Sequence, residues 1–338
     1  MFRKEKMFNN KSILITGGTG SFGKRFVSLL LNNYSPQKLI IYSRDELKQF
    51  EMQQTFSAPC MRYFIGDVRD KERMKSAMRD VDYVVHAAAL KQVPAAEYNP
   101  NECIKTNIYG AQNVIDAAIE TNVSRVIALS TDKAANPVNL YGATKLASDK
   151  LFVAANNMSG AKGPRFSVVR YGNVVGSRGS VVPFYRNILT QGKDVLPVTH
   201  KEMTRFWITL DEGVEFVVKS FQRMQGGEIF VPKIPSIQIV DLVEAMSGKR
   251  EHKIVGIRPG EKLHEVMVPQ EMAHHSLEFA DHYVITPAII FFEKNMDYKK
   301  NKLGEIGLPV ADKFEYHSGT NPHFLSVKEL RALDKVTV

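Results

Sequence analysis

A glycine-rich turn near the N-terminus constrains the fold of this chain more than any other feature. The apolar run Ser12–Thr16 reads as a buried strand, and three glycines spaced three residues apart follow it at the start of an amphipathic segment. Such glycines allow a tight turn, a close approach of the backbone to a pyrophosphate and close packing of a helix on a strand. The helix that begins there directs free N–H groups at the anion. We therefore predict a dinucleotide site on this turn, formed by Gly17, Thr19, Gly20, Ser21, Phe22 and Gly23.

Short apolar runs alternate with amphipathic segments through the first half of the chain. The runs read as strands at Ser12–Thr16, Leu39–Tyr42, Tyr63–Ile65, Tyr83–His86, Val126–Leu129 and Ser167–Arg170. The segments between them read as helices at Phe22–Leu31, Glu46–Phe56, Lys71–Met78, Ala111–Glu120 and Gly142–Asn156. This alternation predicts an α/β fold of Rossmann type, a doubly wound parallel sheet with helices on both faces. Right-handed crossovers then bring the carboxyl ends of the strands to one edge, where ligands bind.

The rhythm breaks after about Asn173, where prolines and glycines recur. We expect three parts: a dinucleotide-binding domain at 1–175 to which 205–232 return, a smaller substrate-binding lobe at 176–270, and a C-terminal extension of unknown role at 271–338. The further elements expected are a helix at Asp211–Met224, a strand at Glu228–Val231, a short helix near Val240–Met246 and a last helix at Val327–Leu333.

Composition and charge exclude several classes of protein. The formal net charge is +9, but lysines and arginines are scattered rather than gathered with aromatics, so we expect a solvated surface and no nucleic-acid partner. Part of the excess suits attraction of a polyanionic substrate. The two cysteines, Cys60 and Cys103, are far apart, the nine histidines lack metal-ligand spacing, and no apolar run approaches about eighteen residues. We expect a cytoplasmic protein without a disulfide, a membrane span or a metal.

Residues at the end of the second expected strand indicate which of the two nicotinamide dinucleotides, NAD or NADP, is bound. NAD-binding folds usually place an acid about twenty residues after the glycine turn to hold the ribose hydroxyls. Here the strand ends at Ser43 and Arg44, whose hydroxyl and guanidinium suit a 2′-phosphate, with Lys48 as a weaker second contact. Asp45 follows directly and keeps NAD open as the minority interpretation. We predict NADP.

Further cofactor contacts are expected where other strands end. Asp67 is placed to accept a hydrogen bond from the adenine amino group, beside Val68. Ala87 and the alanines after it would let the cofactor lie against backbone, although helix or core packing also explains such a run. Lys91 is expected over the cofactor or the sugar, with an ordinary surface lysine as the alternative. Val174, after the sixth strand, completes the set.

A hydroxyl residue, a tyrosine and a lysine follow the fifth strand. Tyr141 and Lys145 lie four residues apart on one face of the expected helix, and Thr131 comes just past the preceding strand. Free tyrosine has a pKa of about 10. We expect a nearby lysine ammonium and the positive nicotinamide to stabilise the phenolate. Tyr141 can then take a hydroxyl proton while hydride leaves the same carbon for the cofactor.

On these motifs the chain resembles the extended short-chain dehydrogenases/reductases, and Asn107–Gly110 match another motif of that group. More narrowly, it resembles the inverting UDP-N-acetylglucosamine 4,6-dehydratases, which begin pseudaminic acid synthesis for flagellin glycosylation. The stretches that carry the resemblance are Gly17–Gly23, Ser43–Lys48, His86–Pro94, Thr131–Pro137, Tyr141–Lys145, Arg170–Ser180, Met203–Thr209 and Arg258–Lys262. The resemblance implies a recycled, tightly bound NADP, UDP-N-acetylglucosamine as substrate, and a homo-oligomer.

The triplet Thr131-Asp132-Lys133 distinguishes this branch, because the retaining hexose dehydratases have Thr-Asp-Glu there. Once C4 of the sugar is a ketone, the C5 proton becomes acidic, and the C6 hydroxyl leaves when it is protonated. Asp132 is the candidate acid and Lys133 the candidate base, so we expect their environments to shift both pKa values toward neutrality. The alternative is a solvent-exposed ion pair in the loop to Asn139. The resemblance implies inversion at C5, with Tyr141 as a candidate proton donor.

The remaining substrate contacts come mostly from the resemblance. Asn173, at the end of the sixth strand, is a candidate phosphate ligand or simply a turn cap. The basic stretch Arg178–Ser180, which contains a glycine, suits a diphosphate. Arg205 and Arg258 suit phosphate, and Glu261 suits the ribose or the uracil. The full set is Lys91, Thr131, Asn173, Arg178, Gly179, Ser180, Arg205, Arg258 and Glu261.

Two other functions remain open on this fold. A UDP-sugar epimerase would share Thr131, Tyr141 and Lys145 but needs neither Asp132 nor Lys133. A non-enzymatic NADP-sensing module typically loses the tyrosine–lysine pair, which this chain keeps. Incubation with UDP-N-acetylglucosamine separates the three hypotheses, since they predict a 4-keto-6-deoxy sugar, a change of configuration alone, and no turnover.

Overall fold

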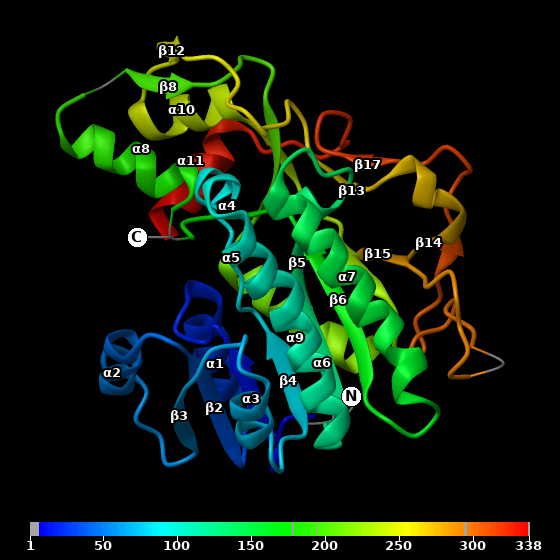
Figure 1. Cartoon of the computed structure of the whole chain (residues 1–338). Coiled ribbons are helices and arrows are strands. Elements are labelled where there is room, and N and C mark those ends of the chain that lie inside the picture. Colours follow the sequence, from blue (N-terminus) through cyan, green and yellow to red (C-terminus); the bar gives the residue numbers. More distant parts are fainter. Residues whose placement is uncertain (1–6, 178, 194, 294–295, 337–338) are drawn as a thin grey trace.

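A central, mainly parallel sheet organises the larger part of the molecule (Figure 1). The computed structural model of the protein describes residues 7–177, 179–193, 195–293 and 296–336. Within them, ten strands are arranged in the order β16-β14-β15-β10-β6-β5-β4-β1-β2-β3. Their bounds are β1 Ser12–Thr16, β2 Lys38–Ser43, β3 Met61–Ile65, β4 Tyr83–His86, β5 Arg125–Thr131, β6 Arg165–Tyr171, β10 Ile229–Pro232, β14 Ser276–Glu278, β15 His282–Ile285 and β16 Leu308–Pro309.

The strand order reverses at β1, as in a doubly wound fold. β1 pairs in parallel with β2 on one side and with β4 on the other, so Thr16 lies opposite both Tyr42 and His86. Ligands bind at such a switch point, outside the carboxyl ends of the strands. The predicted fold class and all six predicted strands are confirmed, but the predicted burial of Tyr63–Ile65 is wrong, because this edge strand is only partly covered and Ile65 is exposed.

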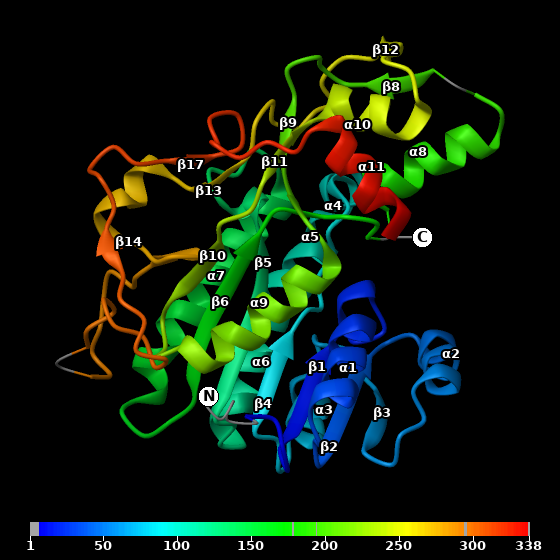
Figure 2. The ribbon, with the colours of Figure 1, turned by 180° about the vertical axis from the view of Figure 1, so that it is seen from behind.

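Helices cover both faces of the sheet (Figures 1 and 2). On one face lie α3 (Lys71–Ala77), α6 (Gly110–Glu120) and α7 (Leu140–Ser159); on the other lie α1 (Ser21–Asn33) and α9 (Leu210–Arg223), while α2 (Glu46–Thr55) follows β2. The helix α9 shows why these segments fold this way. It buries Val214, Val217 and Phe221 at helical spacing, and Thr209 and Glu212 form a capping box at its start.

Two regions for which the sequence predicted no regular element contain helices. Between His86 and Gly110 the chain forms α4 (Val93–Tyr98), α5 (Pro100–Ile104) and a π-helical turn, each of the two α-helices beginning with a proline in its first turn. Their apolar residues, Ala96 and Cys103, pack against Tyr141. In the glycine-rich part, α8 (Val181–Thr190) buries Val182 and Tyr185.

A smaller lobe with its own apolar core lies over the carboxyl ends of the strands (Figure 2). Its elements are β7 (Asn173–Val174), α8, β8 (Leu196–Val198), β9 (Thr204–Ile208), β11 (Ser236–Gln238), α10 (Ile239–Ser247), β12 (His252–Ile254) and α11 (Val327–Val336). Leu196, Trp207, Leu242 and Leu330 are buried together in this core. The last helix of the chain therefore contributes to the lobe, packing on α10.

The segment after Gln270 connects both parts of the molecule. β15 pairs antiparallel with β10 and extends the main sheet, and β17 (Tyr316–His317) pairs with β13 (Val266–Val268). The buried guanidinium of Arg223 on α9 fastens the extension, with Nη2 2.9 Å from both carboxylate oxygens of Asp281 and Nε 2.8 Å from Glu305. Among the described residues, no helix is both long and apolar enough to cross a membrane. Cys60 and Cys103 are both free thiols.

Candidate active site

The glycine turn forms a backbone cradle at the switch point. Gly17 has a φ of +64°, and a Cβ there would lie 2.9 Å from the backbone of Ala88. A Cβ on Gly23 would lie 2.1 Å from the carbonyl oxygen of Gly18. Gly20 is the N-cap of α1 and offers no side chain to cap the helix, so the first-turn amides stay open. These features fit a dinucleotide pyrophosphate, and Thr19, Ser21 and Phe22 lie on the same turn.

The predicted selectivity residues lie at the ends of β2 and β3. Arg44 is half exposed, with Nη1 3.6 Å from an Asp67 oxygen. The Asp45 carboxylate caps α2 through the Lys48 amide and also pairs with the Lys48 ammonium. The buried Ser43 hydroxyl accepts a hydrogen bond from Gln49 at 3.0 Å, a contact that the sequence did not suggest.

Asp67 has a second guanidinium beside it in addition to Arg44. Its carboxylate accepts hydrogen bonds from the Arg69 amide and side chain. Burial alone would raise the pKa of Asp67, but these bonds and the two arginines hold it below its usual value. Next to it, the buried Val68 packs against Gly110.

At the end of β4, Thr16 holds the start of the alanine run. Its Oγ1 accepts hydrogen bonds from the amides of Ala87 and Ala88, and it lies 2.8 Å from Nδ1 of the fully buried His86. Burial, followed by the charge of Lys145, lowers the pKa of His86 to about 3, so this ring is neutral. The backbone at Ala87 is thereby fixed directly opposite the glycine turn.

The triplet after β5 folds into a short 3-10 turn, Asp132–Ala134. The Thr131 hydroxyl lies 2.9 Å from Asp132 Oδ1, and Lys133 Nζ lies 3.1 Å from the same oxygen. Asp132 is only 1% exposed. The alternative of a solvent-exposed ion pair is therefore wrong, because the carboxylate of this pair is inside the protein.

Tyr141 and Lys145 approach the turn Asp132–Ala134 from α7, and we call this region the corner at β5. Asn139 caps this helix through the Gly142 amide, and both side chains are buried. Burial raises the pKa of Tyr141 to about 12, against the lowering effects of the Lys133 charge and of a hydrogen bond with Thr131. Burial lowers the pKa of Lys145, and the charge of Asp149 opposes that shift. The ammonium that favours the phenolate in this geometry is thus that of Lys133.

The expected shift of Lys133 toward neutrality is wrong in this structure. Burial alone would lower its pKa, but the carboxylates of Asp132 and Glu265 outweigh burial and raise it above the ordinary value. Glu265 Oε1 lies 3.3 Å from the Lys133 ammonium, and Glu265 is 2% exposed. The sequence analysis did not place Glu265 in this site.

The buried ion pair between Asp149 and Arg170 joins α7 to the sheet. Asp149 accepts hydrogen bonds from the Ser130 hydroxyl at 2.8 Å and from Arg170 at 3.0 Å, and Arg170 also donates to the carbonyl of Met267. All three side chains are at least nine-tenths buried. This network joins β5, β6 and α7 directly behind Lys145.

The predicted substrate loops meet over this corner. A Cβ on Gly179, where φ is +73°, would lie 2.4 Å from Gln92, so the loop after β7 lies against the loop that carries Lys91. Lys91 is exposed at the rim, and partial desolvation together with the Lys133 charge lowers its pKa. Arg178 lies outside the described residues.

Two predicted substrate residues offer free polar atoms. Among the described residues, Asn173 Oδ1 and Ser180 Oγ are buried without hydrogen-bond partners. Buried polar atoms are normally paired, so these two suit contact with a bound molecule. Val174 follows Asn173 in β7, which pairs with β9.

The two other predicted arginines differ. Arg205 is buried, and its guanidinium donates to the carbonyls of Thr204, Leu263 and Lys262. These contacts do not support the interpretation of Arg205 as a phosphate ligand, because its guanidinium N–H groups are used to hold the loop that contains Lys262 and Leu263. Arg258 is mostly exposed and pairs with Glu261 at 2.8 Å, so it remains open to a ligand.

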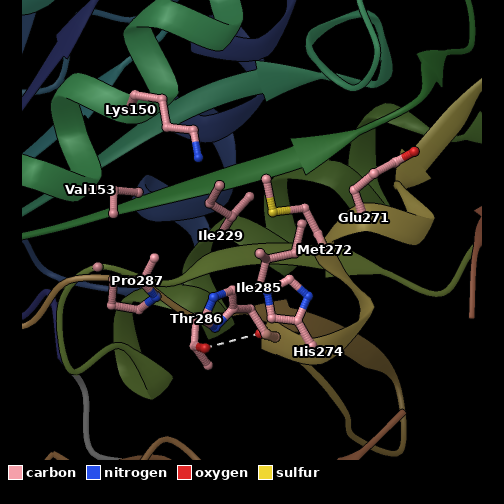
Figure 3. A pocket seen from close by; sticks show the side chains of 12 residues that line it. Lys150, Val153, Ile229, Glu271, Met272, His274, Ile285, Thr286 and Pro287 are labelled. Atoms are coloured by element: carbon pink, nitrogen blue, oxygen red, sulfur yellow. Dashed lines mark hydrogen bonds between the residues drawn. The ribbon is translucent and has the colours of Figure 1, made fainter. Parts of the chain in front are cut away.

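A surface pocket of about 250 Å³ lies away from this corner (Figure 3). Lys150 on α7 and Glu271 lie at its rim, and Ile229, Met272 and Ile285 lie between them. In the part of the chain that is described, none of its lining side chains has a buried polar atom without a partner, whereas Asp132 Oδ2 and Glu265 Oε2 are both such atoms. The unused hydrogen-bonding capacity therefore favours the corner at β5 as the functional site.

Residues 13–287 match the protein family described as polysaccharide biosynthesis protein. A curated relative from Campylobacter jejuni, named UDP-N-acetylglucosamine 4,6-dehydratase (inverting), is 64% identical over 324 residues, which cover 96% of this chain and 97% of the relative. A UDP-glucose 4-epimerase from Rickettsia canadensis is 39% identical and covers 96% of each chain. The solved structure titled Pen from Bacillus thuringiensis has a TM-score of 0.87 and 35% identity, covering 98% of this chain and 99% of that one.

Proposed function

The chain belongs to the polysaccharide biosynthesis protein family, and from that premise we propose that it is an inverting UDP-N-acetylglucosamine 4,6-dehydratase. It is a hydro-lyase whose product is UDP-2-acetamido-2,6-dideoxy-β-L-arabino-hex-4-ulose. The identity of 64% with the Campylobacter dehydratase, against 39% with the Rickettsia epimerase, favours dehydration over epimerisation.

One observation carries this proposal: a buried acid and a partly buried amine lie together beside the tyrosine. Asp132 and Lys133 lie 3.1 Å apart at the end of β5, and Tyr141 faces the same turn from α7. An epimerase needs the tyrosine but has no use for this pair. Elimination of water needs both an acid and a base, which the pair supplies.

The chain's own residues have separable roles in the proposed reaction. When bound, NADP supplies reversible hydride chemistry, removal from C4 and return to C6. Tyr141 takes the C4 hydroxyl proton, assisted by Thr131 and by the positive charge of Lys133, and Lys145 lies on the same face of α7. The Lys133 ammonium then passes a proton to Asp132 across the 3.1 Å contact between them, which leaves a neutral amine and a carboxylic acid. The amine takes the C5 proton, and Asp132 donates its proton to the departing C6 hydroxyl. A lysine base becomes cationic as the enolate forms, and that charge stabilises the enolate.

Arg44 supports NADP over NAD as the cofactor. Its half-exposed guanidinium lies at the end of β2, while the carboxylate of the neighbouring Asp45 is used to cap α2 and pair with Lys48. An acid engaged in this way is less available to the ribose hydroxyls, and the arginine suits a 2′-phosphate. The glycine turn, Asp67, Val68, Ala87, Lys91 and Val174 complete the proposed cofactor contacts.

The proposal also covers the substrate contacts, the cellular location, the assembly and the pathway of the enzyme. The substrate contacts are Lys91, Thr131, Asn173, Arg178, Gly179, Ser180, Arg258 and Glu261, with Arg205 holding the loop that carries the last two. We place the enzyme in the cytoplasm as a homo-oligomer, at the first step of pseudaminic acid synthesis for flagellin glycosylation. Residues 1–175 with 205–232 would bind the cofactor, and 176–270 the substrate.

A single incubation tests the activity. Purified protein is mixed with UDP-N-acetylglucosamine in deuterated water, and the product is followed by NMR. We expect a 4-keto-6-deoxy sugar with inverted configuration and deuterium at C5. A product changed only at C4 would support an epimerase, and binding of NADP without turnover would support a sensing module; either result would overturn the proposal.

A further inference from the structure

A second buried carboxylate, that of Glu265, lies close to the Lys133 ammonium in addition to that of Asp132. Lys133 Nζ lies 3.1 Å from Asp132 Oδ1 and 3.3 Å from Glu265 Oε1. Both carboxylates are at most 2% exposed, whereas the lysine side chain keeps 26% of its surface open. Building on the proposed function, we propose that Glu265 is a positioning residue that holds the Lys133 amine between two acceptors, aimed at the substrate.

Glu265 is itself fixed by the C-terminal part of the chain. Its amide donates to the Ser318 hydroxyl at 2.9 Å, and the Ser318 amide donates back to its carbonyl at 2.8 Å. The Ser318 hydroxyl also lies 2.7 Å from that of Thr204 on β9. Ser318 is fully buried. The backbone that carries this carboxylate is therefore held on both sides by a reciprocal pair of hydrogen bonds.

Other cations lie near Glu265, but they are held elsewhere. Lys262 Nζ is 3.8 Å from Oε2 and donates to the carbonyl of Ala135 at 2.6 Å. Arg205 Nε is 3.9 Å from Oε1, and its fork is occupied by backbone carbonyls. Of these three cations, Lys133 is the nearest to the carboxylate. Glu265 therefore interacts with all three cations and most closely with Lys133.

This placement matters at the step in which the C5–H bond breaks. The proton goes to the Lys133 nitrogen, the electron pair stays on the sugar as the enolate, and Glu265 neither gains nor loses a proton. The carboxylate stabilises the ammonium that forms and keeps the amine from swinging out of line. Misplacing a catalytic group by about 1 Å can reduce the rate roughly 10²-fold.

The pH dependence of the reaction gives a readout that a merely structural residue would not move. The charged or titratable groups that face Lys133 are Asp132, Glu265, Lys91, Arg205, Lys262 and Tyr141. Glu265 raises the pKa of Lys133, so removing its charge lowers that pKa. Because the base acts when neutral, the rising limb of kcat against pH moves to lower pH.

The test compares Glu265→Gln, Glu265→Asp and the matched control Glu228→Gln. Glu228 is also a buried carboxylate, 3% exposed, but it lies directly before β10, at the amino end of that strand, and accepts hydrogen bonds from Ser167 and from the Gln225 and Gly226 amides. Each variant is assayed with UDP-N-acetylglucosamine for kcat, KM, deuterium entry at C5 and thermal unfolding. We expect Glu265→Gln to lower kcat and deuterium entry roughly 10²-fold on the pH-independent plateau, where the base is fully neutral in both proteins, with little change in KM.

The variants separate the possible outcomes. Glu265→Asp, which keeps the charge, should retain the pH profile of the wild type, whereas Glu265→Gln should shift it to lower pH; Glu228→Gln should keep both rate and profile. The inference is overturned if Glu265→Gln keeps the wild-type rate, if its profile does not move, or if Glu265→Asp shifts as Gln does. Failure of the wild type to form a 4-keto-6-deoxy sugar would instead contradict the proposed function.

Discussion

Charged side chains gather at two places along the carboxyl edge of the sheet. At the ends of β2 and β3, the side chains of Arg44, Asp67 and Arg69 are 52%, 22% and 36% exposed. At the end of β5, Asp132 and Glu265 are 1% and 2% exposed around Lys133. Exposed pairs contribute at most about 1 kcal/mol each, whereas breaking a buried pair leaves an uncompensated charge inside the protein.

The difference separates recognition from chemistry. A solvent-exposed charged side chain can be replaced by another residue without disturbing the fold, so the end of β2 is suited to selecting a cofactor. A buried charge constrains its partners, and that constraint keeps proton donors and acceptors in a fixed arrangement. If this comparison is correct, substitutions should have effects that decrease from the corner at β5 to the open edge and outer helices.

Lys133→Ala should have the largest effect. Loss of a general base removes roughly 10³-fold of the rate, so kcat for formation of the 4-keto-6-deoxy sugar should fall by about that factor. Binding of UDP, measured by calorimetry, serves as the control and should change little. Near-normal dehydration by this variant would mean that another group removes the C5 proton.

Asp149→Asn should have the next largest effect, on stability. The change leaves the buried Arg170 without its carboxylate partner and should lower the free energy of unfolding by about 3 kcal/mol, as measured by urea denaturation. The effect should also appear in Lys145, because the charge of Asp149 raises its pKa. Stability equal to that of the wild type would show that the buried pair at this corner resembles an exposed one.

Arg44→Glu should change affinity and leave the fold intact. In the proposed complex Arg44 would face the 2′-phosphate, so its replacement by an acid should weaken NADP binding roughly 10- to 100-fold. NAD binding, titrated in parallel, should change much less, and the unfolding midpoint should stay near that of the wild type. Unchanged NADP affinity would contradict the assignment of cofactor.

Lys75→Ala should have the smallest effect. Lys75 on α3 pairs with Glu72 and with Glu120 on α6, at the outer surface. Solvent screens such pairs, so the thermal midpoint should be indistinguishable from that of the wild type. A clear drop would show that exposed networks on this face contribute more than the comparison allows.

The first half of the fold could be predicted because its signals are local. Each buried strand is a short apolar run, and the predicted helix at Gly142–Asn156 lies inside the observed Leu140–Ser159. The helices α4 and α5 were missed because they are too short to show periodicity and are stabilised by packing of Ala96 and Cys103 on Tyr141.

The candidate site could be predicted in its parts but not in its electrostatics. Thr131, Asp132, Lys133 and Tyr141 meet at one turn, since strand ends and helix faces follow from sequence spacing. The predicted direction of the Lys133 pKa was wrong because the carboxylates of Asp132 and Glu265 together outweigh burial, and Glu265 reaches the site only through tertiary structure. The one local signal that Glu265 is buried was its position directly before the apolar run of β13, Val266–Val268.

The reciprocal bonds between Glu265 and Ser318 have a consequence for the order of assembly. Proteins fold from the N-terminus as they are synthesised. The glycine turn and the first six strands are complete at Tyr171, so they can form before Ser318 has left the ribosome. A nascent chain would therefore form its glycine turn well before the amine of Lys133 is fixed. Substitution of that serine should accordingly loosen the site around Lys133 and leave the glycine turn in place.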